Sequence, residues 1–574
     1  MTAPADTNSA PEEMPKTFIR LWLLALVLIS LFIRVHGADE FYYNPDEAMH
    51  IGMAKGETLA EVSHYSLYET HPPLGNYIRH YWLMLSDTPA FARDMSLLCG
   101  ILLILLYYRI GRLANGELTG LCCSALIAFS HGCIIQSYIV RNYAVFVLFL
   151  SLSFHDYLRW RKQDRNTMPI GYGLWSTLAC LTHFSGIFFV ACIGGYEMLV
   201  MHKRKASYPQ HGRWLLANGI ATFAAATGYV LWQPVLAPLH HPFFDEIFAT
   251  PQKLALCTLF SPLATGGYIL SNYSVALVLL LGMAWVAIAR PAFIRNKAGM
   301  NSCLALTGVF FALQMTILAT GTYPVLGTQR SLWTLPVYIL PAGWIIADLC
   351  ALIEAKLSKR IPALSQVMAL LLFGAAAATY NPAERFTDRN YIMKQSDWQA
   401  LTGYFQKLGS ADLIVAQRSD GTLVRNPYPF FDQSSFTALA PVIRIPFGTT
   451  HVLIDEFYPH EYNMTALPDM IQAAQTAHLL EGKDRLVFFT TGWSVSHLTD
   501  LAHCPALDKE IVTFPRLGPD ENLTVDSHIS AALLIVPKQR FLDDVLSPQG
   551  KAYGCLEAMR AQSSNTSSAA PTPH

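Results

Sequence analysis

Long apolar runs separated by short polar segments fill the first two thirds of the chain and predict a bundle of membrane-spanning helices. About 20 apolar residues in a helix cross the roughly 30 Å of hydrocarbon in a bilayer. The region 168–202 is long enough to cross twice, and we divide it into two short spans. The chain then has about eleven spans. The other spans are expected near 18–36, 91–112, 117–138, 141–158, 213–235, 268–290, 300–320, 329–353 and 361–380.

Basic residues orient these spans, because lysine and arginine favour the cytoplasmic side of a membrane. Four basic clusters follow alternate spans, and all four lie inside only if 168–202 crosses twice. The clusters begin at Arg159, Lys203, Arg290 and Lys356. The outer side then receives the first loop, 37–90, the loops 236–267 and 321–330, and everything after the last span.

The first external loop is too long for a simple connection and shows two helical patterns. One runs from Pro45 to about Ala60. The other begins at residues 71–74 and continues through Trp82. Apolar and aromatic residues at helical spacing here predict helices that lie in the membrane interface.

After about residue 380 the pattern changes to short strands that alternate with helices. This predicts a small extracytoplasmic α/β domain with a mainly parallel sheet. Neither a GxGxxG sequence nor a P-loop is present, so nucleotide binding is not indicated. Strands are expected at 413–416, 451–454, 486–489 and 531–536, and helices near 396–408, 467–480 and 494–503. We therefore divide the chain into a disordered cytoplasmic tail (1–17), a transmembrane domain (18–380), an α/β domain (381–560) and a disordered tail (561–574).

The composition agrees with this division. The 574 residues are 52% hydrophobic and 14% charged, whereas soluble proteins carry roughly 25% charged residues. A net charge of −1 provides no bulk attraction to nucleic acid, which we do not expect as a partner. Of the 11 cysteines only Cys504 and Cys555 lie in the C-terminal part, where an extracytoplasmic location would allow a disulfide. The absence of CxxC pairs argues against a structural zinc site.

Acidic residues stand directly after the first span. Asp46 and Glu47 occupy the first turn of a helix, and His50 shares a face with Asp46. Acids in a first turn can merely complement the helix dipole, but Glu69 lies in the same loop. A carboxylate that is partly desolvated at a lipid interface has a raised pKa and is a stronger base. We therefore interpret Asp46 as a general base for a hydroxyl or amine, with Glu47 beside it.

Two arginines begin spans from the outer side, where the positive-inside rule would not place them. Arg141 begins one span and Arg330 another. Snorkelling to phospholipid phosphates is the alternative for such residues. Two outward guanidiniums can bind a phosphate or diphosphate through paired hydrogen bonds. We expect Arg93, next to Asp94, to form a structural ion pair instead.

Three histidines are less informative. His183 lies inside an apolar run, where a core histidine bonded to a neighbouring helix is the more common case. His240 and His241 stand in the 236–267 loop and could bind a metal ion or the acceptor. A divalent ion is compatible with these residues, but no ligand spacing indicates one. We predict no metal and no cofactor.

Five short motifs fall on the outer side of the predicted spans. They are Asp46-Glu47-Ala48, His71-Pro72-Pro73-Leu74, Arg141-Asn142-Tyr143, Thr182-His183-Phe184 and Gln329-Arg330. Their order and common side resemble the GT-C superfamily of polyprenyl-phosphate-sugar-dependent glycosyltransferases. Within it they resemble the protein O-mannosyltransferase-like branch, which includes the aminoarabinose transferase of lipid A. The resemblance covers roughly residues 18–380.

The resemblance implies an inverting sugar transfer on the outer face of the membrane. The acid of the family's first loop maps onto Asp46, and its phosphate-binding arginine onto Arg141, with Arg330 a less close match. Some relatives carry lysine where this chain has His71, and histidine adds charge only when protonated. Many relatives need no metal. We place the remaining candidates around the substrate: His50, Glu69, Tyr143, His183, His240 and His241.

We therefore predict a glycosyltransferase of the bacterial inner membrane. It would move a hexose or pentose from a polyprenyl-phosphate donor to lipid A or another glycolipid, an envelope polysaccharide or a protein. The alternative is a transporter or lipid flippase, but those folds usually show repeats and mid-membrane polar groups that this sequence lacks. A sensor anchored by its spans is a third possibility. The sequence does not specify the sugar, the acceptor or the oligomeric state.

Overall fold

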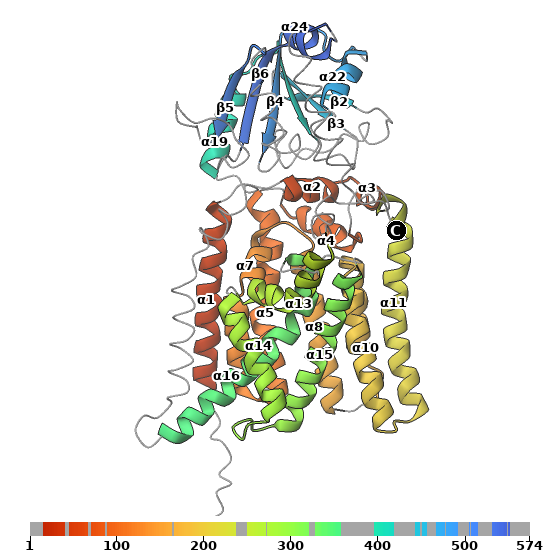
Figure 1. Cartoon of the computed structure of the whole chain (residues 1–574), viewed down its shortest axis with the longest axis vertical. Coiled ribbons are helices and arrows are strands. Elements are labelled where there is room, and N and C mark those ends of the chain that lie inside the picture. The colour runs from red at the N-terminus through yellow and green to blue at the C-terminus, as the bar shows by residue number, and fades with distance from the viewer. Residues whose placement is uncertain are drawn as a thin grey trace, which may run out of the picture.

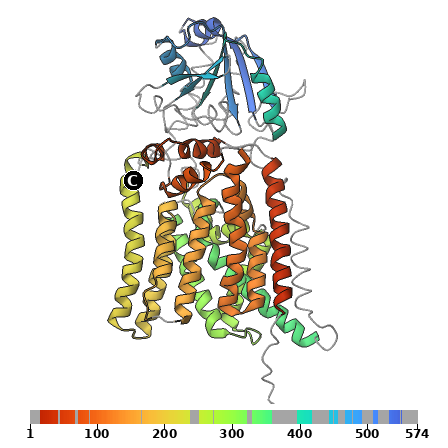
Figure 2. The ribbon, with the colours of Figure 1, turned by 180° about the vertical axis from the view of Figure 1, so that it is seen from behind.

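The computed structural model combines a helical bundle with a sheet-containing C-terminal part (Figure 1). Figure 2 shows the same arrangement from behind. The structure describes residues 15–40, 45–66, 71–86, 89–163, 166–236, 250–270, 273–320, 328–357, 395–417, 442–447, 450–455, 467–476, 478–491, 504, 507–514, 531–547 and 549–550.

The bundle contains the long apolar helices that the hydrophobic pattern predicts. Five helices among the described residues are long and apolar enough to cross a membrane, or seven if each of two bent pairs is one span. The chain is thus an integral membrane protein. The expected span 361–380 lies outside the described residues. The bundle helices are α1 (Lys16–Glu40), α5 (Pro89–Asn115), α6 (Glu117–Ala128), α7 (His131–Tyr138), α8 (Tyr143–Gln163), α9 (Ile170–Thr182), α10 (Gly186–Lys203), α11 (Tyr208–Leu236), α13 (Pro251–Ile269), α14 (Tyr273–Ala289), α15 (Lys297–Ala319) and α16 (Leu335–Leu357).

Large apolar side chains cover the outside of the bundle as well as its interior. On α1, Leu24, Leu28 and Phe32 are 54%, 55% and 70% exposed. A patch of this kind is unfavourable in water but is expected where a helix faces lipid tails.

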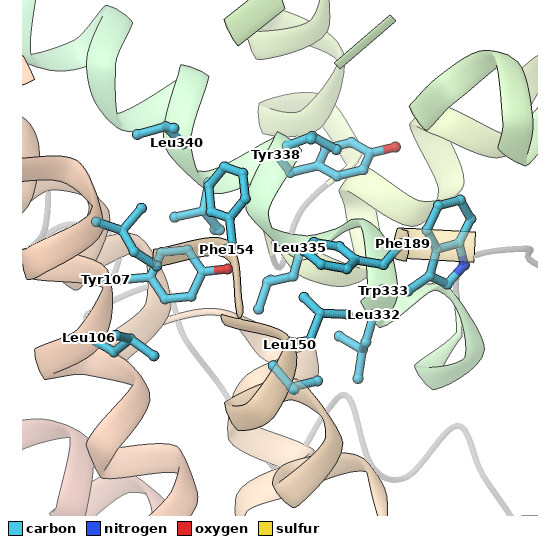
Figure 3. Close-up of a cluster of buried hydrophobic side chains, with 14 of the residues drawn as sticks. Leu106, Tyr107, Leu150, Phe154, Phe189, Leu332, Trp333, Leu335, Tyr338 and Leu340 are labelled. Atoms are coloured by element: carbon cyan, nitrogen blue, oxygen red, sulfur yellow. The ribbon is translucent and has the colours of Figure 1, made fainter. Parts of the chain in front are cut away.

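The interior packs around a short 3-10 helix, η1 (Gln329–Thr334), at the start of α16. Leu332 and Trp333 of η1, and Leu335 at the start of α16, extend into a cluster of buried rings (Figure 3). The rings come from three other helices: Tyr107 of α5, Phe154 of α8 and Phe189 of α10. This packing fixes η1, and with it Arg330, against α8 and α10.

The predicted span 117–138 is not one straight helix. It consists of α6 and α7, which are bent by 56° at residues 129–130. The buried Arg34 of α1 satisfies the free carbonyl end of α6, since its Nη1 donates to the Ala128 oxygen at 3.1 Å. Its Nε donates to Ser137 Oγ on α7 at 3.1 Å. A charged side chain from α1 therefore holds the bend.

The predicted division of 168–202 agrees with the structure, whereas part of the predicted loop 236–267 is wrong. α9 and α10 separate at His183. Residues 251–269 form α13, which meets α14 at a bend of 118°. Pro262 inside α13 cannot donate to the Thr258 carbonyl, and Ser261 Oγ donates to that oxygen at 3.0 Å instead.

Three short helices of the first external loop lie across one end of the bundle in both views (Figures 1 and 2). They are α2 (Pro45–Ala54), α3 (Leu59–Ser66) and α4 (Leu74–Leu83). The first predicted pattern is thus two helices, separated near Gly56. A Cβ there would stand 3.0 Å from the Val62 backbone nitrogen, so the turn has little room for a larger residue.

The C-terminal part contains a sheet with the strand order β2-β3-β1-β4-β6-β5. Its centre, β3-β1-β4, is parallel, but β2, β6 and β5 each pair antiparallel with a neighbour. The prediction of a mainly parallel sheet therefore holds for the centre alone. Its strands are β1 (Asp412–Gln417), β2 (Val442–Phe447), β3 (Thr450–Asp455), β4 (Arg485–Thr491), β5 (Glu510–Phe514) and β6 (Ala531–Pro537), and its helices include α19 (Gln395–Phe405), α22 (Leu467–Thr476) and α24 (Lys538–Phe541).

In both views the sheet lies beyond α2 and α3 (Figures 1 and 2).

The expected helix at 494–503 lies outside the described residues. Cys504 is disulfide-bonded, as the sequence allowed, while Cys555 lies outside the described residues.

Candidate active site

Three aromatic rings from distant parts of the chain meet near α4. The His71 ring centroid lies 4.4 Å from that of His183 and 5.6 Å from that of Tyr143. The His183 and Tyr143 centroids are 4.9 Å apart. The HPPL motif before α4, the start of α8 and the turn between α9 and α10 therefore meet at one place.

Positive charge gathers around these rings. The Arg141 guanidinium carbon lies 5.6 Å from the centroid of Tyr143, a cation–π distance. Arg330 stands in η1, whose first turn is capped by Thr328. His183 lies within electrostatic reach of Arg141, Arg330 and His71. The structure thus brings together the three groups that the sequence proposed for phosphate binding.

Glu47 does not extend freely toward this cluster. It is 2% exposed, and its Oε2 accepts from Arg93 Nη2 at 3.2 Å while its Oε1 accepts from Arg93 Nε at 3.2 Å. The Val140 backbone N–H also donates to Oε1 at 2.9 Å. The ion pair expected at Arg93 is found here with Glu47, not with the adjacent Asp94. Glu47 ties α2 to α5 and to the turn before Arg141.

A buried polar network continues from α2 to the start of α8. Arg79 Nη1 donates to Asn76 Oδ1 at 2.8 Å and lies 3.5 Å from His50 Nδ1. Arg79 Nη2 donates to Asn142 Oδ1 at 3.3 Å. Asn76 Nδ2 donates in turn to Ser66 Oγ of α3 at 2.9 Å. This network connects α2, α3, α4 and the turn that carries Arg141.

Sequence reasoning missed Arg79 and Asn76. One signal was available, since Arg79 is a basic residue in an external loop, where the positive-inside rule does not favour it. Its full burial depends on neighbours that only the folded chain supplies.

Close backbone approach places the HPPL motif against this turn. A Cβ at Gly75 would stand 2.2 Å from Asn142 Oδ1 and 2.6 Å from its Cγ. The Asn142 side chain is held by Arg79 and has little freedom to move. Glycine is therefore required for α4 to reach the start of α8.

Comparisons with known proteins identify similar chains. A model of the dolichyl-phosphate-mannose-protein mannosyltransferase family matches residues 70–232, which include His71, Arg141 and His183. ArnT from Cupriavidus metallidurans in the apo state is 13% identical, with 90% of this chain and 98% of that chain covered and a TM-score of 0.50. The same protein bound to undecaprenyl phosphate is 12% identical, with the same coverage and TM-score.

This chain has the GT-C fold. The resemblance inferred from the five motifs is confirmed by the family match and by the two ArnT structures. The Pmt1-Pmt2 complex of S. cerevisiae, a protein O-mannosyltransferase bound to its sugar donor, is 16% identical with a TM-score of 0.30. That match covers 38% of this chain and 33% of the yeast chain, so this chain spans about a third of the yeast chain's length. None of the curated proteins matches.

Within the GT-C fold, the described cluster lies at the end of the bundle where α2, α3 and α4 cross it (Figure 1). Asp46 occupies the second position of α2, one helical turn before His50. Its side chain lies outside the described residues, as do Glu69, His240 and His241. Among the residues that the structure describes, no three potential ligands gather for a metal ion.

Proposed function

We propose that this chain is an inverting glycosyltransferase that moves a sugar from a polyprenyl-phosphate donor to an acceptor on the outer face of the membrane. One observation carries the proposal. Arg141, Arg330 and His71 approach the same buried His183 at the end of a GT-C bundle. Two guanidiniums near these imidazole rings, next to apolar helices, suit a ligand with an anionic head and a lipid tail.

The donor phosphate is the group that these cations fit. Guanidiniums form paired hydrogen bonds with phosphate oxygens and stay charged at all working pH values. In a largely buried site such charges stabilise a leaving phosphate without reorganisation, because they are already oriented. The similarity to ArnT bound to undecaprenyl phosphate supports a polyprenyl phosphate as leaving group.

Asp46 is the proposed general base. It takes a proton from an acceptor hydroxyl or amine, whose lone pair attacks the anomeric carbon as the bond from that carbon to the phosphate oxygen breaks. A single displacement inverts the configuration. Glu47 is less suited to this role because Arg93 and the Val140 N–H occupy its carboxylate. His50, Glu69 and Tyr143 complete the proposed substrate-binding set, together with His240 and His241.

The acceptor side of the proposal is broader. A glycolipid such as lipid A, an envelope polysaccharide or a protein at the bacterial inner membrane would each present a hydroxyl or amine. The C-terminal sheet lies beyond α2 and α3 (Figure 1), and we propose that it helps to select the acceptor. The proposed topology keeps eleven spans and places both the site and the sheet outside.

The test is a transfer assay with the purified protein in lipid nanodiscs. Each of several polyprenyl-phosphate sugars is offered with envelope extract, and the product is identified by mass spectrometry. We expect transfer by the native chain, none by Asp46→Asn, and native activity in Glu57→Gln, which alters an exposed acid of the same loop. Full activity of Asp46→Asn would remove Asp46 as the base. Movement of a lipid-linked sugar across sealed vesicles without any transfer would favour a transporter.

A further inference from the structure

We propose that His183 is a neutral hydrogen-bond donor to a phosphate oxygen of the lipid donor, and that Ser185 fixes the tautomer that makes it one. This inference rests on the proposed function, and it gives a defined role in that reaction to His183, which the sequence placed only among the possible substrate-binding residues. It stands on the contacts of the two ring nitrogens.

The first nitrogen is occupied as an acceptor. The Ser185 backbone N–H donates to His183 Nδ1 at 3.1 Å, and Ser185 Oγ lies 2.7 Å from the same atom. A backbone N–H can only donate, so Nδ1 carries no proton. The proton of the neutral ring must then be on Nε2. The turn between α9 and α10 thereby selects one tautomer and excludes the doubly protonated ring.

The second nitrogen is a donor that the described residues do not satisfy. His183 is 1% exposed, and its Nε2 has no hydrogen-bond partner among them. Buried donors normally have a partner, so an unsatisfied one within a candidate site indicates a ligand atom. The ligand must offer an acceptor.

The surroundings of His183 specify an anionic acceptor. His71 lies 4.4 Å away between ring centroids, and Arg141 and Arg330 lie within electrostatic reach. An anionic oxygen is attracted by both guanidiniums and can also accept from a neutral N–H. A protonated His183 would add repulsion in a site that already holds these charges, so a neutral donor fits better.

Two substitutions separate this role from a purely structural one. Asparagine places an amide oxygen near the position of Nδ1, so His183→Asn retains the acceptor for the Ser185 N–H but loses the Nε2 donor. Glutamine places an amide nitrogen near the position of Nε2, so His183→Gln retains a donor but loses the local acceptor. A structural histidine is replaced better by asparagine, and a ligand donor better by glutamine.

The experiment measures binding of undecaprenyl phosphate to the full-length protein in nanodiscs, by native mass spectrometry, alongside thermal stability. We expect His183→Asn to bind about tenfold more weakly with little change in Tm. We expect His183→Gln to bind within about threefold of the native chain, with a lower Tm. His202→Asn, at an exposed histidine in the last turn of α10, is the control. Competition with inorganic phosphate distinguishes two kinds of site. Millimolar phosphate displaces the lipid from a site for free phosphate but does not displace it from a site for a lipid phosphate.

The outcomes separate this inference from the proposed function. Native affinity in His183→Asn, with binding by the native chain, would overturn the role of His183 and leave the glycosyltransferase proposal intact. A native chain that binds no undecaprenyl phosphate would overturn both. If inorganic phosphate displaced the lipid, His183 would still be a donor to phosphate, but the site would not be specific for a lipid phosphate.

Discussion

Arg93 holds Glu47 through both carboxylate oxygens, with Arg93 Nη2 3.2 Å from Glu47 Oε2 and Arg93 Nε 3.2 Å from Oε1. The pair joins α2, which carries Asp46, to α5 of the bundle. Because its carboxylate is held in this way, Glu47 fixes α2 in place and is less suited than Asp46 to the proposed role of general base.

The first prediction concerns this pair. Glu47→Gln removes the Glu47 carboxylate from the guanidinium of Arg93, which is 12% exposed. Breaking one partner of a buried pair costs about 3–5 kcal/mol, so we expect a clear loss of stability in thermal or denaturant unfolding of the detergent-solubilised protein. The double variant Glu47→Gln/Arg93→Gln should recover part of that loss, because no lone charge remains. A Glu47→Gln protein with native stability but no activity would instead assign Glu47 to catalysis.

The second prediction concerns the guanidinium at 141. Hydrogen bonds to charged groups contribute about 1.5–3 kcal/mol, so Arg141→Met should weaken donor binding by roughly 10- to 100-fold. Arg141→Lys keeps the charge but loses the paired hydrogen bonds of the guanidinium. Its affinity for the donor should fall between those of the native chain and Arg141→Met. Arg204→Met, at the exposed C-cap of α10, is the matched control. Equal donor affinity in native protein and Arg141→Met would show that Arg141 contacts bulk phospholipid instead.

The third prediction concerns Gly75 and Asn142. Gly75→Ala places a methyl group 2.2 Å from Asn142 Oδ1, and relief requires α4 or the Asn142 side chain to move. Overpacking of this kind costs about 1–3 kcal/mol. We expect lower stability and weaker donor binding, since the same turn carries Arg141.

Two further variants test that explanation. Gly219→Ala, where a Cβ meets nothing within 4 Å, should be neutral or slightly stabilising. In an Asn142→Ala background the cost of Gly75→Ala should shrink, because the obstructing amide is absent. An unchanged cost there would place the clash elsewhere.

The fourth prediction concerns pH. Burial, and then the charges of Arg79, Arg141 and His71, lower the pKa of His50 well below its ordinary value of 6.5, against a smaller effect of Asn76. Below about pH 6.5 the unfolded chain binds a proton at this position that the folded chain does not. Stability therefore falls as the pH drops from 6.5 toward the folded pKa, by up to about 1.4 kcal/mol per pH unit.

The check is the slope of unfolding stability between pH 5 and 7, taken as an approximate working range for histidine titration. His50→Gln lacks the titrating ring and should show a smaller slope than the native chain. His202→Gln, at an exposed histidine in the last turn of α10, should keep the native slope. Identical slopes in native protein and His50→Gln would mean that His50 is protonated in the folded state.

The sequence by itself determined the features that depend on local pattern. The length of an apolar run sets whether it crosses a bilayer, and the excess length of 168–202 predicted two helices, which the structure shows as α9 and α10. Helical periodicity located α4, and the order of short motifs pointed to the GT-C resemblance. These inferences succeed because each requires residues that are neighbours in the chain.

Tertiary structure decided what depends on residues far apart in the chain. Glu47 meets Arg93 and Val140 only in the folded chain, and Arg79 is buried among His50, Asn76 and Asn142, two of which are distant from it in sequence. In α13 the Ser261 hydroxyl donates to the Thr258 carbonyl, which Pro262 cannot reach as a donor. The antiparallel direction of β6 and β5 depends on the strands with which they pair. The sequence likewise shows His183 only as a histidine in an apolar run. The folded structure gives its two ring nitrogens different surroundings. No local pattern encodes these contacts, because each is the product of long-range packing.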